Sequence, residues 1–468
     1  MPALTRPNIL FINTDQQRHD TLGCYGSPVA KTPHLDRLAA DGVRFTHCYT
    51  TNPVCMPARA SYVTGQYPSH HGVWMNGVPL SRRAETLQGA LGRGGYHTGL
   101  IGKIHLDNVW LRGEPHPEYD FQVLHECEGD PYCKDEYFHW LDAQGLYEPY
   151  LKQFKREGHR NGYVRDLPEA KHMNNWIAGL CEEYVQQRAA DGRPFFLSAG
   201  FFDPHHPFDP VEPYASLFTP EEMPMPRYRE GEEARMTPPA RGMYDAIHAY
   251  CQDPGPRGIR ATIAAYHATI AHVDAMVGRL LAALEETGLA DNTVVIFTSD
   301  HGEMLGDHGL LWKGPLFYEG AVRVPLIYRF PARCGVTGVQ GGFVSHVDLA
   351  PTVAALTGVP GPHLAQGQPL FSETLEPQPT RDAALVEWRE KRFQSDDPFT
   401  VARCLVTEDW KYVHYHDRLY GELYDRRDDP DEFDNRWAER PDVAAEMQDR
   451  LLAFILENEP CPPRTDIF

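Results

Sequence analysis

The sequence predicts an α/β protein with a large, mostly parallel central sheet, followed by a small α+β domain with an antiparallel sheet. Short segments that are apolar on both faces alternate with segments of helical spacing over the first ~370 residues, as in a parallel sheet covered by helices. Around residues 369–379 the composition turns polar and proline-rich, which indicates a linker. We therefore expect one domain over residues 1–372 and a second over residues 380–468.

The strands of the first domain are predicted where Val, Ile, Leu and Phe occupy both faces of a short segment. These segments are 8–13, 96–101, 194–199, 293–298 and 324–329. Helices are expected between them, at 32–42, 167–190, 258–288 and 348–358. Two further segments, at about 106–165 and about 204–257, interrupt the alternation and predict long loops above the sheet. In the second domain we expect strands at 383–387, 402–406 and 411–415 and a final helix at 443–457.

Composition excludes several classes of protein. The chain has 42% hydrophobic and 23% charged residues and a net charge of −21, so it is globular and acidic. That charge would repel nucleic acid and an anionic membrane, and we expect neither as a partner. No apolar run reaches the ~18 residues of a transmembrane helix, and the N-terminus does not resemble a signal peptide. Together with 10 cysteines that form no CxxC pair, this predicts a cytoplasmic protein with reduced thiols.

Acidic residues and a histidine follow two of the predicted strands. Asp15 comes directly after the first strand, and Asp300 and His301 come after the strand at 293–298. Ligands of open α/β sheets bind beyond the carboxyl ends of the strands, and carboxylates with an imidazole can hold a divalent cation. The alternative is that the two aspartates only cap turns.

Cys55 lies at or just before the start of a short predicted helix that ends at Gly65. The free N–H groups and the positive dipole end of a helix stabilise an anion there, so we expect a lowered pKa for the thiol. Arg59 is one turn further on and can reach back toward position 55. The alternative is a small buried cysteine, which is the usual place of a free thiol.

The segment Cys55-Met-Pro57-Ala-Arg59, followed by Val63-Thr64-Gly65, resembles the signature of the formylglycine-dependent (type I) sulfatase family of the alkaline phosphatase superfamily. Further motifs occur in the order of that family: Asn13-Thr-Asp15-Gln16 with Gly23-Cys-Tyr-Gly26 behind it, Gly102-Lys103-Ile-His105, Asp203-Pro-His205-His-Pro-Phe208, Thr298-Ser-Asp300-His301-Gly302-Glu and Leu311-Trp-Lys313. Residues 422–435 resemble an element of the family's C-terminal domain. The resemblance extends from residue 8 to about 440 and implies the alkaline-phosphatase-like sandwich fold.

The resemblance also implies two cofactors. In the family, Cys-x-Pro-x-Arg directs a formylglycine-generating enzyme to oxidise the cysteine, here Cys55, to Cα-formylglycine. One divalent metal ion, Ca²⁺ with Mg²⁺ or Mn²⁺ as alternatives, would be bound by Asp15, Gln16, Asp300, His301 and the oxygen at position 55. The substrate implied is a small-molecule sulfate monoester. The sequence does not decide whether the protein forms a homo-oligomer.

Five residues receive catalytic roles from the same resemblance. Arg59 and Lys103 would stabilise the oxyanion at position 55 and the charged oxygens of the substrate. His105 would hydrogen-bond the second hydroxyl of the hydrated aldehyde. His205 and Lys313 would face the transferred group and its leaving oxygen.

Two assignments keep an alternative. His205 is adjacent to His206, and we prefer His205 because it takes the family position in Pro-His-x-Pro-Phe. Asn76 is a candidate for substrate binding through its amide, but a turn asparagine is an equal alternative.

The sequence departs from the sulfatase pattern at two metal ligands. Gln16 stands where many members have an acidic residue, and His301 stands where many have asparagine, as in the phosphonate monoester hydrolase and phosphodiesterase branch. Lys103 and His105 have the sulfatase form, so we favour an arylsulfatase-like activity, with the phosphorus-ester activity as the alternative. A non-catalytic metal-binding paralogue with unmodified Cys55 is a less favoured interpretation. A phosphatase that uses the Cys55 thiol directly is disfavoured, because the motif spacing serves maturation.

Overall fold

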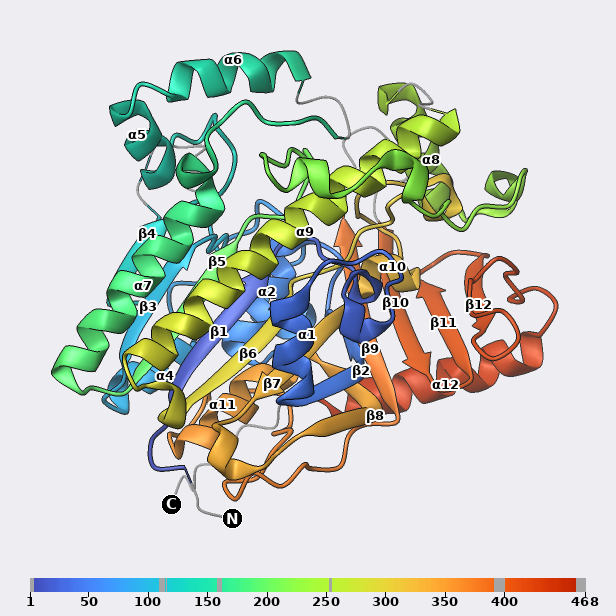
Figure 1. Ribbon diagram of the computed structural model, residues 1–468. Helices are drawn as coiled ribbons and strands as arrows, with labels where there is room; N and C mark the ends of the chain where they lie inside the picture. The colour runs from blue at the N-terminus through green and yellow to red at the C-terminus, as the bar shows by residue number, and fades with distance from the viewer. Residues whose placement is uncertain are drawn as a thin grey trace, which may run out of the picture.

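The computed structural model describes residues 4–108, 114, 116–157, 162–251, 255–390 and 400–459. Over these residues the strands form an eight-stranded sheet in the order β4-β3-β5-β1-β6-β7-β2-β8 and a four-stranded sheet in the order β12-β11-β10-β9 (Figure 1). The strands of the large sheet are β1 Asn8–Thr14, β2 Val43–Tyr49, β3 His97–Gly102, β4 Val123–Glu126, β5 Phe195–Phe201, β6 Thr293–Ser299, β7 Arg323–Arg329 and β8 Gly338–Ser345. The strands of the small sheet are β9 Ala383–Glu390, β10 Thr400–Thr407, β11 Trp410–Tyr415 and β12 Gly421–Asp425. The predicted fold class is therefore confirmed.

The large sheet is parallel from β4 to β6, but β7 is antiparallel to both of its neighbours, β6 and β2. The prediction of a parallel strand at 324–329 is thus wrong. The connection from β6 to β7 has no long helix that crosses the sheet, and it returns the chain from the edge at which β6 ends. Strands β2, β4 and β8 were not predicted, because they lie toward the ends of the sheet and are only partly buried.

Helices cover both faces of the large sheet (Figure 1). Along β1, Leu10 and Ile12 pack in the hydrophobic cluster that contains α7 and α9, whereas Ile9 and Phe11 pack in the opposite cluster. The helices are α1 Pro33–Ala40, α2 Cys55–Thr64, α3 Pro68–His71, α4 Leu87–Arg93, α5 Glu136–Ala143, α6 Tyr147–Glu157, α7 Met173–Asp191, α8 Pro238–Cys251, α9 Gly255–Glu286, α10 Glu319–Val322, α11 Leu349–Thr357 and α12 Pro441–Glu457. This strict alternation along the strand explains why both faces of β1 are apolar.

The two long segments predicted as loops above the sheet contain α5, α6 and α8, which lie beyond the ends of the strands (Figure 1). The segment at 369–379, which we expected to be a linker, is packed against the first domain. Leu370, Phe371 and Leu375 are buried in the same core as Ile9 and Phe11, so the polar and proline-rich stretch is packed. Apolar residues spaced among prolines are sufficient to anchor such a segment.

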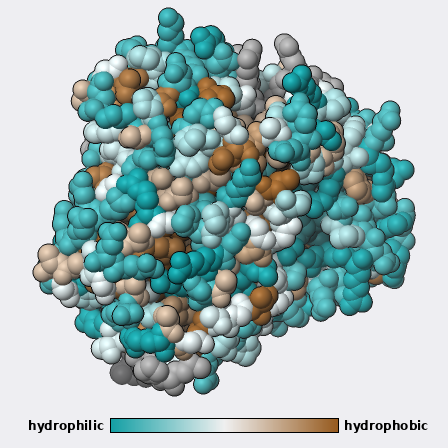
Figure 2. Space-filling view, viewed as in Figure 1, coloured by the Kyte–Doolittle hydropathy of each residue, from teal (hydrophilic) through white to brown (hydrophobic). Residues whose placement is uncertain are grey.

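None of the described helices is long and apolar enough to cross a membrane. The face shown in Figure 2 is largely hydrophilic, with small scattered hydrophobic patches.

A buried ion cluster joins the small sheet to the segment between β6 and β7 of the large sheet. The ammonium of Lys411, in β11, lies 2.8 Å from Glu319 Oε1 of α10 and contacts Glu432. It also donates a hydrogen bond of 2.9 Å to the carbonyl oxygen of Phe317. The Lys411 side chain is fully buried, so the small sheet supports the chain segment just after Lys313 with a charge that water does not reach.

We expect Lys411→Met to destabilise the fold by about 3–5 kcal/mol, because the buried carboxylate of Glu432 would lose the cation that it shares with Glu319. Lys134→Met is the control, since Lys134 pairs with Asp142 on the surface and its loss should not shift the unfolding midpoint measurably. Guanidinium chloride unfolding, followed by tryptophan fluorescence, measures both. Equal shifts for the two variants would contradict this account of the cluster.

Candidate active site

Most of the predicted site residues lie just beyond the ends of four adjacent strands. Asp15 follows β1, Lys103 and His105 follow β3, His205 follows β5, and Asp300 and His301 follow β6. Parallel strands end at the same edge of a sheet, which brings these residues together across the whole length of the chain. At Gly102 the backbone has a φ of 109°, and a Cβ there would lie 2.0 Å from the carbonyl oxygen of Gly200. Only glycine therefore lets the chain turn at this point toward Lys103.

Cys55 is the first residue of α2. Its Sγ lies 3.2 Å from His301 Nε2 and 3.6 Å from Asp15 Oδ1. The side chain of Asn76 caps this helix, because its Oδ1 accepts a hydrogen bond of 2.9 Å from the backbone N–H of Met56. The turn-and-capping role of Asn76 is thus visible, and its contact with substrate stays a prediction.

The expected lowering of the Cys55 pKa is wrong. Burial, together with the nearby carboxylate of Asp15, raises the pKa of this thiol to about 11 against the opposing effects of Lys313 and Lys103. The dipole of the first helical turn is too weak to compensate for the loss of water around a thiolate. With no metal ion beside it, the Cys55 thiol is therefore protonated at neutral pH.

The guanidinium of Arg59 is fully buried and binds both aspartates of the cluster. Its Nε donates to Asp300 Oδ2 at 2.8 Å, and one terminal nitrogen donates to Asp15 Oδ2 at 3.1 Å. The other terminal nitrogen donates to Asn13 Oδ1 at 3.2 Å and to the carbonyl oxygen of Lys103 at 2.9 Å. Arg59 thus points at the carboxylates and fixes them, a task that the sequence alone did not indicate.

Asp15 remains a carboxylate although it is buried. Burial by itself would raise its pKa, but Lys103, His205 and Arg59 lower the pKa of Asp15 to well below its ordinary value. The Lys103 ammonium lies 2.7 Å from Asp15 Oδ2, the same oxygen that Arg59 binds. The other carboxylate oxygen of Asp15, Oδ1, faces Cys55 and His301.

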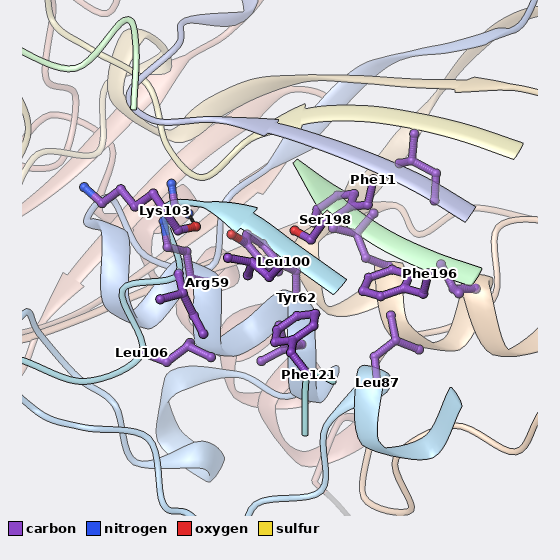
Figure 3. Close-up of a pocket in the computed structure, with 15 residues that line it drawn as sticks. Phe11, Arg59, Tyr62, Leu87, Leu100, Lys103, Leu106, Phe121, Phe196 and Ser198 are labelled. Atoms are coloured by element: carbon purple, nitrogen blue, oxygen red, sulfur yellow. Dashed lines mark hydrogen bonds between the residues drawn. The ribbon is translucent and has the colours of Figure 1, made fainter. Parts of the chain in front are cut away.

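Behind Arg59 and Lys103 lies an apolar pocket, and Figure 3 shows the two cations at one end of it. Aromatic side chains, among them Phe11, Tyr62 and Phe196, line the rest of this pocket. Such surroundings do not solvate charge, which strengthens the pairing of the two cations with the carboxylates.

Four side chains are suited to hold a divalent metal ion. Ligand atoms of Asp15, Cys55, Asp300 and His301 all lie within 4.8 Å of one another, and all four residues are buried. His301 donates from Nδ1 to the carbonyl oxygen of Gly302 at 2.9 Å, so its Nε2 lone pair faces the cluster. Two carboxylates and an imidazole fit a hard or borderline cation.

Lys313, His205 and Gln16 form the other side of the site. The Lys313 ammonium lies 2.5 Å from His205 Nε2 and contacts Gln16 Oε1. His205 donates from Nδ1 to the backbone oxygen of His206 at 2.6 Å, and Gln16 Nε2 lies 3.1 Å from His206 Nδ1. Gln16, expected as a metal ligand, therefore faces Lys313 through its carboxamide oxygen here. Both histidines of the pair reach this side of the site.

His105 is held from behind by a residue that sequence reasoning missed. Its backbone N–H donates to Glu128 Oε1 at 2.9 Å, and its φ of 46° is left-handed. Glu303 is the last residue of the motif that begins at Thr298, and the family resemblance assigned it no role. It is fully buried and contacts the Gln16 amide. Glu303 was marked only by its place at the end of that motif, and no sequence signal distinguishes Glu128 from a surface glutamate, because its importance depends on burial.

The loop that carries His205 is anchored to α7. Asp203 is buried and accepts a hydrogen bond of 2.7 Å from the side chain of Asn174. His172 caps α7 and, with His272 and Asp203, forms a second buried group of possible ligand atoms. The Nδ1 of His172 accepts the backbone N–H of Asn174 at 3.2 Å, so this group supports the loop and the helix.

Two family models match the chain. The model described as Sulfatase matches residues 7–359, and the one described as N-sulphoglucosamine sulphohydrolase, C-terminal, matches residues 306–457.

Individual proteins agree with these matches. The chain is 34% identical to the uncharacterized sulfatase YidJ of Escherichia coli over 97% of this chain and 88% of that protein. It is 32% identical to the multifunctional alkaline phosphatase superfamily protein PehA of Trinickia caryophylli, over 95% of this chain and 94% of that protein. The crystal structure of a phosphonate monoester hydrolase of Agrobacterium radiobacter superposes with a TM-score of 0.83 and 28% identity, covering 98% of this chain and 100% of the other.

We expect Arg59→Lys to weaken the binding of a divalent metal by about 10–100-fold, because a lysine cannot bridge both aspartates. Isothermal titration of the Cys55 thiol form with Ca²⁺, Mg²⁺ and Mn²⁺ measures the affinity. Arg165→Lys is the matched control, since Arg165 is also buried and pairs with an aspartate, Asp209, outside the metal cluster. An unchanged affinity in Arg59→Lys, or an equal loss in both variants, would show that Arg59 does not organise the cluster.

Proposed function

We propose that this chain, which belongs to the sulfatase family, hydrolyses sulfate monoesters of the arylsulfatase type with a nucleophile made from Cys55. The resemblance seen in the motifs and the assignment as a hydrolase are thereby confirmed. The observation that supports the specific reaction is the place of Cys55: its Sγ lies 3.2 Å from His301 Nε2 and 3.6 Å from Asp15 Oδ1, within a group of potential metal ligands.

Two additions to the chain complete this proposal. Cα-formylglycine, made from Cys55 by a formylglycine-generating enzyme, supplies as its hydrate an attacking oxygen and a second hydroxyl for release of the product. A divalent ion, Ca²⁺ with Mg²⁺ or Mn²⁺ as alternatives, supplies Lewis-acid stabilisation of negative charge, held by Asp15, Asp300, His301 and the atom at position 55. Gln16 would join these ligands only by giving up its bond to Lys313.

The chain's own cations would orient the ester. Its net charge of −21 repels anions in general, so binding of a sulfate group depends on Arg59, Lys103 and Lys313. His205 would pass a proton to the leaving oxygen; because its Nε2 accepts from the Lys313 ammonium, that proton would come from Lys313. His105 would remove the proton of the second hydroxyl and so release sulfate. We expect the substrate to be a small-molecule ester. We expect the protein itself to be cytoplasmic.

Hydrolysis of phosphonate monoesters or phosphodiesters is the second candidate. The phosphonate monoester hydrolase superposes with a TM-score of 0.83. Gln16 and His301 also resemble the residues of that branch. Lys103 and His105 favour sulfate, because the phosphorus branch usually has hydroxyl side chains there. An unmodified, non-catalytic protein is the third outcome.

We expect Cys55→Ala to abolish turnover and to leave the fold intact, because alanine cannot be oxidised to the aldehyde whose hydrate supplies the attacking oxygen. Cys181→Ala is the control, since Cys181 is an equally buried free cysteine in α7. Aryl sulfate hydrolysis and circular dichroism measure the two properties. Peptide mass spectrometry across position 55, after co-expression with the maturation enzyme, should show the aldehyde that has lost sulfur. Full activity of Cys55→Ala would overturn the proposal, and an unaltered thiol would favour the non-catalytic interpretation.

We expect kcat/KM for an aryl sulfate to exceed that for the aryl phosphonate monoester and the phosphodiester by at least tenfold, or about 1.4 kcal/mol of transition-state binding. The three esters share one leaving group, and the enzyme is matured and supplied with metal. The reverse preference would identify a phosphorus-ester hydrolase and show that Gln16 and His301 are the better guides.

A further inference from the structure

Glu303 is a buried carboxylate that the reaction described above does not use. It lies two residues after His301, its side chain is fully buried, and it is not a member of the metal cluster. Its Oε2 contacts the Gln16 Nε2, while its Oε1 accepts backbone N–H groups from Leu305, at 2.9 Å, and from Trp312. One carboxylate thus ties together the segment after β1, the segment after β6 and the loop that carries Lys313.

All three partners of Glu303 have a left-handed backbone. The φ angles are 67° at Gln16, 50° at Leu305 and 64° at Trp312, and none of these residues is glycine. Such conformations are strained for residues other than glycine and persist only where the surroundings hold them. The carboxylate receives the N–H groups of Leu305 and Trp312 and the amide of Gln16, so it is a common restraint on all three.

Two of the contacts of Glu303 restrain the Lys313 ammonium. Trp312 is the preceding residue, so its bond to Glu303 fixes the backbone from which the Lys313 side chain starts. The Gln16 amide nitrogen faces Glu303, which leaves the Gln16 oxygen to accept from Lys313. The second contact of the ammonium is His205 Nε2, at 2.5 Å. Glu303 thus restrains Lys313 through the backbone and through a side chain.

We propose that Glu303 is a positioning residue, which holds Lys313 beside His205 where the leaving oxygen of the ester departs. This inference rests on the proposed function for its chemistry, and Glu303 itself touches no substrate. Loss of the restraint should slow the reaction most when the leaving oxygen needs a proton or a positive charge most. An ester with a good leaving group should be affected little.

The kinetic test compares Glu303→Gln with the parent on phenyl sulfate and on 4-nitrophenyl sulfate, with the matching phosphonates run in parallel. We expect kcat for the phenyl ester to fall by about 10–100-fold and kcat for the nitrophenyl ester by only a few-fold. Glu422→Gln is the matched control, because Glu422 is also buried and accepts hydrogen bonds, from Tyr415 and Thr237, in the C-terminal part of the chain. Equal losses on both leaving groups in Glu303→Gln would overturn the inference.

A second measurement needs no turnover. Acetic anhydride labelling, read by peptide mass spectrometry, should increase several-fold at Lys313 in Glu303→Gln and should stay constant at Lys103, whose partner is Asp15. Circular dichroism and Ca²⁺ titration of the same sample show whether the fold and the metal cluster are retained. If no ester is hydrolysed but Lys313 labelling rises, the proposed function fails and the positioning role stands. Unchanged labelling of Lys313 would refute the positioning role itself.

Discussion

The contact between the Arg59 guanidinium and the carboxylates of Asp15 and Asp300 is the interaction on which the site depends. Two like charges in a water-free interior repel each other, and a cation that donates to both removes this repulsion. Because Arg59 takes Oδ2 of each aspartate, Oδ1 of each is left on the side of Cys55 and His301. The same residue therefore stabilises the cluster and orients the Oδ1 atoms of both aspartates, and the pocket behind it is lined mainly by apolar side chains, which solvate charge poorly (Figure 3).

The sheet supplies the frame for this contact. The ends of β1, β3, β5 and β6 set the distances among the acidic, basic and imidazole groups, since the strands are hydrogen-bonded in register. The connection from β6 to β7 stays at the same edge and brings Lys313 opposite His205, and Lys411 of the small sheet binds the chain just beyond that loop. The left-handed residues and buried carboxylates here cost stability, which the apolar clusters on both faces of β1 offset.

Sequence reasoning predicted the buried parallel strands well, because their composition reports burial on both faces directly. Sequence reasoning failed where the structure of a segment depends on contacts with other parts of the chain. The direction of β7 depends on how the chain returns from β6, and the packing of the proline-rich segment depends on the core that receives Leu370 and Phe371. The pKa of Cys55 follows the same rule: the helix start is local, whereas burial and the carboxylate of Asp15 come from distant parts of the chain.

The sequence by itself determined the family, the α/β fold class and the residues with chemical capacity, because motif spacing and apolar patterning are local properties. Only the tertiary structure decided what those residues touch. It turned Arg59 toward two aspartates, placed the Gln16 oxygen against Lys313, and made Glu303 a common restraint on three left-handed residues. The physical reason is that charge pairing, desolvation and backbone strain depend on atoms up to about 300 positions apart in the chain, whose distances are set only when the sheet forms.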